Sequence, residues 1–237
     1  MKHFIIALQF LTRLPTPRIG AVTSEDFAAS MRWFPVAGLL IGLVVAGGVW
    51  LGARIDPWTG ALIALCVWVA VTGALHLDGL SDLADGIGAA HANRERLLAV
   101  MADPHIGSFG VVAIVLQIAA KLVLLHGAIV AEAWTAIALI PFAARIGPLV
   151  WARWLEPLHA GLGARFAGAI RPVDLIGWGA VLVGAALFAP ALLVTPLLIA
   201  HFGLWLHLRL GGVSGDCHGA GIELVETGLL LALILTV

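Results

Sequence analysis

Seven long apolar stretches are the feature that most constrains what this chain can fold into. A helix that crosses a lipid bilayer needs about 20 mostly apolar residues, because the hydrocarbon core is about 30 Å thick. Hydrophobic residues make up 61% of the chain and charged residues only 11%, against about 25% charged residues in a soluble domain. We therefore expect residues 1–237 to form one all-α, polytopic membrane bundle of about seven transmembrane helices. The predicted spans are residues 33–52, 58–76, 106–130, 134–152, 174–190, 191–210 and 222–237.

The basic residues indicate how this bundle is oriented. Lys and Arg concentrate in the cytoplasmic loops of membrane proteins. If the N-terminus is cytoplasmic, only Arg54 lies on the outer side, and Lys121 and Arg145 fall within spans. The asymmetry predicts a cytoplasmic N-terminus, and the net charge of −1 gives no indication of nucleic-acid binding. The inner segments hold the remaining ten basic residues, Lys2, Arg13, Arg18, Arg32, Arg94, Arg96, Arg153, Arg165, Arg171 and Arg209.

An acidic motif, HLDGLSDLADG at residues 76–86, follows the second apolar stretch. If the helix of that span continues through the motif, Asp78, Asp82 and Asp85 project from one face, because they are spaced by four and three residues. Mg²⁺ binds one or two carboxylates together with substrate phosphates and water, so the spacing favours a magnesium site. The alternative is a solvated acidic helix end, and the Asp78-Gly79 pair also permits a turn that would break the helical register.

Two further polar segments reach the same membrane edge. In MADPHIGSFG, residues 101–110, the pair Asp103-Pro104 favours a helix start, and the region of Gly107 offers backbone N–H groups that favour phosphate binding. The segment GGVSGDCHGAGIELVETG, residues 211–228, places Asp216 and His218 in a loop and Glu223 near the start of the last span. The alternative for the acidic residues is that they only complement a helix dipole.

Two cations fall inside predicted spans. Lys121 shares a helix face with Gln117 in the third span, and Arg145 lies in the fourth. A charge at the centre of a span costs at least about 2.5–3.5 kcal/mol, so it normally faces the bundle interior and has a partner. Two interpretations stay open, namely structural ion pairs and neutralisation of substrate phosphates.

These motifs resemble those of the cobalamin synthase family, the adenosylcobinamide-GDP ribazoletransferases. The resemblance runs nearly from end to end. It departs from the family pattern at His105, where the family often has a basic residue, and in the loop SGDCHG, where the family often reads TGDTLG. The segments that carry the resemblance are FLTRLPTP (10–17), FPVAGLLIG (34–42), HLDGLSDLADG (76–86), RERLLAVMADPHIGSFG (94–110) and GGVSGDCHGAGIE (211–223).

The resemblance implies a Mg²⁺-dependent transferase of cobalamin biosynthesis in the bacterial inner membrane, with its active face in the cytoplasm. It implies that α-ribazole, or its 5′-phosphate, attacks the phosphoryl group attached to cobinamide in adenosylcobinamide-GDP, so that GMP leaves and adenosylcobalamin or its 5′-phosphate forms. The predicted metal ligands are Asp78, Asp82 and Asp85, and the predicted catalytic residues are Asp82, Asp103 and Asp216. The predicted substrate-binding residues are Arg94, Arg96, Lys121, Gly107, His76, His218 and Glu223.

Two other functions remain open at this stage. CDP-alcohol phosphotransferases also use spaced aspartates at a membrane edge, but their D-G-x-x-A-R opening differs from the DGLS of residues 78–81. A small-molecule transporter would line a pathway across the membrane with its charges, whereas the acidic residues here gather at one face. The expected partners are the two substrates and the lipid bilayer, with no nucleic acid. A homo-oligomer and a complex with other cobamide-assembly enzymes are the alternatives for protein partners.

Overall fold

The computed structural model describes residues 1–90, 93–158 and 168–236, and within these residues the chain is all-helical with no strand. The predicted all-α class is confirmed. Arg165, counted above among the inner basic residues, lies outside the described residues. The elements are α1 (Lys2–Leu11), α2 (Ser24–Ser30), η1 (Met31–Trp33), α3 (Phe34–Gly52), α4 (Pro57–Thr72), α5 (Leu75–Ala90), α6 (Arg94–Met101), α7 (Ser108–Val130), α8 (Trp134–Ala144), α9 (Ile146–Trp154), α11 (Pro172–Ala186), η2 (Pro190–Val194), α12 (Thr195–Leu210) and α13 (Gly215–Ile234).

Fewer than seven helices of the described residues are long and apolar enough to cross a membrane. α4 and α5 are long and apolar enough to cross a membrane only as a bent pair, so the described residues hold at most six spans. α11 has 15 residues and reaches only about 22 Å at 1.5 Å per residue, which is short of the hydrocarbon core. The polytopic bundle is confirmed, but the count of seven is not. Five stretches qualify by themselves: Ser24–Gly52, Ser108–Val130, Trp134–Trp154, Pro190–Leu210 and Gly215–Ile234.

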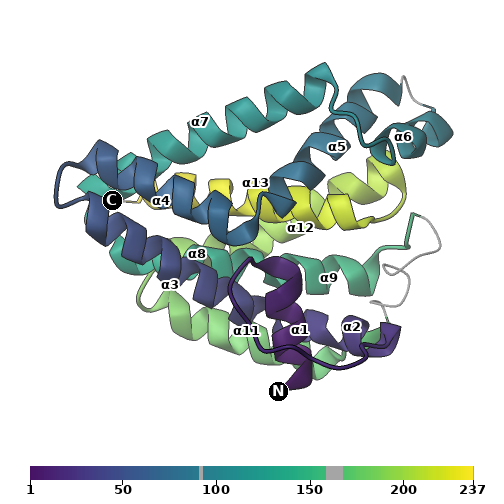
Figure 1. Cartoon of the computed structure of the whole chain (residues 1–237), viewed down its shortest axis with the longest axis horizontal. Coiled ribbons are helices and arrows are strands. Elements are labelled where there is room, and N and C mark those ends of the chain that lie inside the picture. The colour runs from purple at the N-terminus through teal and green to yellow at the C-terminus, as the bar shows by residue number, and fades with distance from the viewer. Residues whose placement is uncertain (91–92, 159–167, 237) are drawn as a thin grey trace.

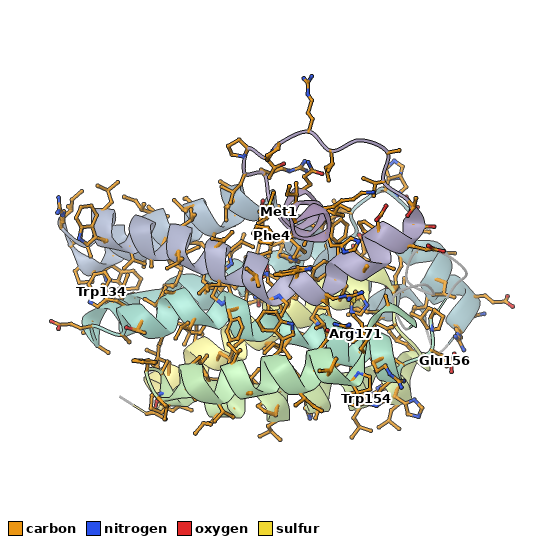
Figure 2. All side chains as sticks on the ribbon, turned by 90° about the horizontal axis from the view of Figure 1, so that it is seen from below. Met1, Phe4, Trp134, Trp154, Glu156 and Arg171 are labelled. Atoms are coloured by element: carbon orange, nitrogen blue, oxygen red, sulfur yellow. The ribbon has the colours of Figure 1, made fainter. Side chains whose placement is uncertain are left out.

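The polar segments lie at one end of the bundle. Figure 1 shows the far end of α5, helix α6, the start of α7 and the connection between α12 and α13 together at the right-hand end. The opposite end holds the connection between α3 and α4, the end of α7 and the C-terminus. In Figure 2, Trp134 and Glu156 lie near opposite ends, so α8 and α9 together run the length of the bundle. We call the end with α6 the polar end.

Glycines allow the closest helix contact in the bundle, between α3 and α8. A Cβ at Gly38 would clash with the carbonyl oxygen of Pro141, and one at Gly42 would clash with that of Ala138. In a membrane, small residues of this kind let helices approach until their backbones touch. The abundance of glycine in the sequence therefore has a packing cause at these positions.

α5 does not continue α4, and the prediction that the acidic segment extends the second span as one helix is wrong. Gly73 and Ala74 both have a left-handed backbone, with φ of +61° and +59°, and the helix axis bends by 85° between α4 and α5. Glycine adopts this conformation freely, whereas alanine does so at a cost. The side chain of Arg13 packs against Gly73 and leaves no room for a Cβ there. Beyond the bend the helix is unbroken through Asp78-Gly79, so the predicted register of the aspartates is kept.

α13 begins earlier than predicted. Ser214 caps it, because its Oγ accepts the backbone N–H of Cys217 at 3.3 Å. Asp216 and His218, predicted to lie in a loop, therefore belong to the first turn of the helix. Glu223, predicted near the helix start, lies about two turns inside it and is buried. The glycine-rich sequence does not break this helix, because two of its glycines make close contacts: Gly219 lies against α5, and Gly221 lies against Trp151 of α9 and Phe202 of α12.

Candidate active site

The candidate site forms where α5 crosses α13. A Cβ at Gly79 would lie 2.8 Å from the carbonyl oxygen of Asp216, and one at Gly219 would lie 3.3 Å from the Cα of His76. Only glycine leaves room for so close a crossing. The contact brings together the two acidic motifs that the sequence separates most widely.

A cavity of about 150 Å³ opens at this crossing, and we call it the crossing cavity. His76, Asp78, Asp216 and His218 form its polar wall, and side chains of α1 and α3 contribute to its apolar wall. Asp78 is exposed, whereas His76 and His218 are 2% and 8% exposed. The Nε2 atom of His76 and the Nδ1 atom of His218 have no hydrogen-bond partner among the described residues. A buried polar atom without a partner costs free energy, so a ligand that contacts these nitrogens would gain affinity.

The aspartates of the two helices act on one another electrostatically. Asp82 is partly buried, and the charges of Asp78, Asp216 and Asp85 act on its carboxyl group, in that order of strength. No three His, Cys, Asp or Glu side chains of the described residues converge tightly enough to enclose a metal ion by themselves. Mg²⁺ needs only one or two carboxylates when phosphates and waters complete its shell. Asp78 and Asp82, one helical turn apart, fit this partial ligand set.

Asp85, the third predicted metal ligand, holds the start of α7. Its side chain is buried, and its two oxygens accept the backbone N–H groups of Gly107 at 2.7 Å and of Gly110 at 2.9 Å. α7 begins at Ser108, so the helix start predicted at Asp103-Pro104 is wrong. The N-cap residue is Gly107, which has no side chain to accept these N–H groups. The carboxylate of Asp85, on helix α5, accepts them instead. The N–H of Gly107, predicted to bind phosphate, is thus occupied by Asp85.

Eight of the twelve predicted site residues do not line the crossing cavity, among them Asp82, Asp103, Arg94 and Arg96. Asp103 lies between α6 and α7 and accepts hydrogen bonds from the backbone N–H of His105 at 3.0 Å and from its imidazole at 2.7 Å. The backbone N–H and then the imidazole lower the pKa of Asp103. Arg96 is exposed in the first turn of α6, and Arg94 lines a different cavity.

A network of four buried charges fills the bundle beside the site. The Nζ of Lys121 lies 2.7 Å from Glu223 and 2.5 Å from Glu226, and the Nη1 of Arg145 lies 2.5 Å from the second oxygen of Glu226. All four residues are buried. Two positive and two negative charges make the network neutral, with Gln117 donating a further hydrogen bond to Glu223 at 2.8 Å. The prediction that the buried cations face the interior and have partners is confirmed, and the geometry favours structural ion pairs over contacts with phosphate.

The buried charges connect to the crossing cavity through His76. The Nη2 of Arg145 lies 3.5 Å from the Nδ1 of His76. Arginine has only donors, so Nδ1 is the acceptor, and the neutral imidazole then carries its proton on Nε2. The unpartnered Nε2–H is therefore a hydrogen-bond donor at the cavity. Glu226, which holds Arg145 in place, is the residue that sequence reasoning left out of the site.

Comparisons with known proteins agree with this arrangement. The model of the family described as cobalamin-5-phosphate synthase matches residues 3–234. The chain belongs to this family. The adenosylcobinamide-GDP ribazoletransferase of Novosphingobium aromaticivorans is 65% identical, over 100% of this chain and 97% of the relative. The proteins of the same name from Laribacter hongkongensis and Thiobacillus denitrificans are 51% and 45% identical, each over 98% of this chain and over 96% and 94% of their own length. No solved structure matches the chain.

Membership of the cobalamin-5-phosphate synthase family confirms the resemblance seen in the sequence. The match includes both α5 and α13, so every residue of the crossing cavity lies within it. It favours the family's chemistry over the CDP-alcohol phosphotransferase and the transporter. The buried ion pairs also account for Lys121 and Arg145 without a pathway through the membrane.

Proposed function

We propose that this protein transfers the phosphocobinamide group of adenosylcobinamide-GDP to α-ribazole or α-ribazole 5′-phosphate. The hydroxyl oxygen of the ribazole attacks the phosphorus attached to cobinamide. The bond from that phosphorus to the bridging oxygen breaks, and GMP leaves with this oxygen. The product is adenosylcobalamin or its 5′-phosphate, and the hydroxyl proton passes to a base of the protein. The observation that carries the proposal is that Asp78 and Asp216 line a cavity beside two buried histidine nitrogens without partners among the described residues, with Asp82 one helical turn beyond Asp78.

We propose Mg²⁺ as the metal, held by Asp78 and Asp82. Phosphoryl transfer depends mainly on positioning and on neutralising phosphate charge. When bound, Mg²⁺ would neutralise the diphosphate and orient it. Asp85 is assigned to α7 instead, because both of its oxygens already accept backbone N–H groups. The polar end of the bundle would face the cytoplasm of a bacterial cell, at its inner membrane, as the basic residues predict.

Asp216 is the base that the geometry favours. It lines the crossing cavity, whereas Asp103 lies in the connection to α7 and is bonded to His105. A general base must come within hydrogen-bond reach of the proton that it removes. His76 would donate its Nε2–H to a phosphoryl oxygen. Glu223, predicted to bind substrate, is assigned to the buried ion pairs instead.

The experiment that tests the function follows GMP release by chromatography. Purified protein is incubated with adenosylcobinamide-GDP, α-ribazole and Mg²⁺. Removing a general base typically costs about 10²–10⁴ in rate, so Asp216→Asn should lose at least about 100-fold. Asp82→Asn should lose activity as well, because it removes a ligand of the Mg²⁺ that would neutralise the diphosphate. Glu95→Gln, which changes an exposed acid of α6, should keep wild-type activity. Wild-type rates in both aspartate variants would overturn the site, and phosphatidyl transfer from a CDP-lipid without GMP release would overturn the reaction.

A further inference from the structure

A second cavity at the polar end carries two unpaired cations. It has a volume of about 310 Å³ and lies between the end of α5, helix α6 and the end of α12. Arg94 and Arg209 line it, and we call it the cationic cavity. No salt bridge joins either arginine to an acidic side chain, and all fourteen acidic residues lie within the described ranges. Both arginines are exposed, so their charges are open to a ligand, and an anion between them would be attracted by both.

An apolar trough continues from the cationic cavity along the bundle. It has a volume of about 290 Å³ and shares Ile87 and Trp205 with the cationic cavity. Leu80, Leu83 and Ala84 of α5 form one side, and α12 and α13 form the other. α12 belongs to a stretch that is long and apolar enough to cross the membrane. The cationic cavity and the apolar trough therefore meet along a helix that is long and apolar enough to cross the membrane.

The trough lies on the opposite side of α5 from the aspartates. At about 100° per residue, Leu80, Leu83, Ala84 and Ile87 fall within an arc of about 100°. Asp78, Asp82 and Asp85 fall within an arc of about 60°, centred roughly 175° away by the same helical geometry. A substrate diphosphate bound by Asp78 and Asp82 would therefore lie across α5 from the trough. The cationic cavity and the crossing cavity also share no lining residue.

We propose that the cationic cavity and the trough together bind one anionic phospholipid. Its phosphate lies between Arg94 and Arg209, and an acyl chain follows the apolar trough beside Ala84. Basic pockets between transmembrane helices on the cytoplasmic side bind anionic head groups in this way. The walls beyond the arginines are mainly apolar, which suits a lipid chain better than a guanine ring, whose polar edge needs hydrogen-bond partners. Arg94 is thereby assigned to a lipid phosphate instead of the substrate phosphate that the sequence predicted.

The test measures lipid retention by native mass spectrometry of the full chain in detergent. Phosphatidylglycerol is the probe, and phosphatidylcholine with the same chains is the neutral reference. Wild type should retain one phosphatidylglycerol at concentrations at which phosphatidylcholine dissociates. Arg94→Gln/Arg209→Gln should weaken retention at least tenfold, and so should Ala84→Trp, which fills the trough but keeps both arginines. Arg18→Gln/Arg153→Gln is the matched control, since it removes two exposed arginines outside the cavity and should retain the lipid like wild type.

Three results would overturn the proposal. Equal loss in Arg18→Gln/Arg153→Gln would mean that overall charge, not the cavity, holds the lipid. Wild-type retention in Ala84→Trp would mean that no chain lies in the trough. Displacement of phosphatidylglycerol by GDP, with GDP binding lost in Arg94→Gln/Arg209→Gln, would assign the cavity to a nucleotide. Ala84→Trp decides the question even if the double arginine variant fails to fold.

Discussion

Substitution of Glu226 tests how much the buried ion pairs contribute to the stability of the bundle. It is 0% exposed and is the one acid that contacts both Lys121 and Arg145. Glu226→Ala would leave two cations with Glu223 alone, so the network would carry a net charge of +1. Breaking a buried ion pair by removing one partner costs about 3–5 kcal/mol. A folded domain is stable by only about 5–15 kcal/mol, so this loss would be a large part of the total.

The neighbouring acid provides an internal comparison. Glu223→Ala also leaves a net charge of +1, but Glu226 still contacts both cations, so we expect a smaller loss than in Glu226→Ala. A second substitution, Arg145→Met in the Glu226→Ala background, restores neutrality, because Lys121 and Glu223 remain as a pair at 2.7 Å. We expect it to recover part of the lost stability. Glu95→Ala, at an exposed position of α6, is the control and should unfold like wild type.

The assay is unfolding of purified protein in mixed micelles, with a rising fraction of a denaturing detergent and tryptophan fluorescence as the readout. We expect wild type to be the most stable, Glu223→Ala to be intermediate and Glu226→Ala to be the least stable. This expectation would be refuted if Glu226→Ala unfolded at the same detergent fraction as wild type. It would also be refuted if Arg145→Met destabilised the Glu226→Ala variant further.

Two further predictions concern the start of α7. Gly110→Ala should destabilise the protein, because its Cβ would clash with Ser81 and Asp85. Gly177→Ala, which has open space around it, should unfold like wild type. Equal unfolding midpoints for the two variants would contradict this explanation. Asp85→Ala should cost about 0.5–2 kcal/mol, as loss of an N-cap does, while the Mg²⁺ concentration for half-maximal GMP release stays unchanged. A large rise in that concentration would restore Asp85 as a metal ligand.

The sequence predicts the class of fold from its apolar stretches. It also predicts that the buried cations have partners, because an unpaired charge in lipid is costly, but it does not predict that these partners are Glu223 and Glu226. It also predicts the register of Asp78, Asp82 and Asp85 within α5. Local helical geometry fixes this register, and it does not depend on how α5 is oriented. These features need only the residue types and their spacing along one helix.

Other features depend on contacts between segments that are far apart in the sequence. The bend before α5 needs a left-handed alanine at Ala74, for which no local sequence signal exists. The early start of α13 is not evident from the sequence, because Gly219 and Gly221, which pack against neighbouring helices, look like loop glycines. Asp85 and Gly107 are 22 residues apart, so nothing near Asp85 marks it as the cap of α7. The fifth predicted span is not confirmed, because the apolar stretch continues past Ala186, where helix α11 ends.

The central claim is that Asp78 and Asp82 hold a divalent ion against the diphosphate of the substrate. Electron paramagnetic resonance with Mn²⁺ in place of Mg²⁺, in the presence of adenosylcobinamide-GDP, tests it directly through coupling to phosphorus. The account predicts one bound Mn²⁺ with phosphorus coupling in wild type and Glu95→Gln, and loss of that signal in Asp82→Asn. Undiminished phosphorus coupling in Asp82→Asn would contradict the claim.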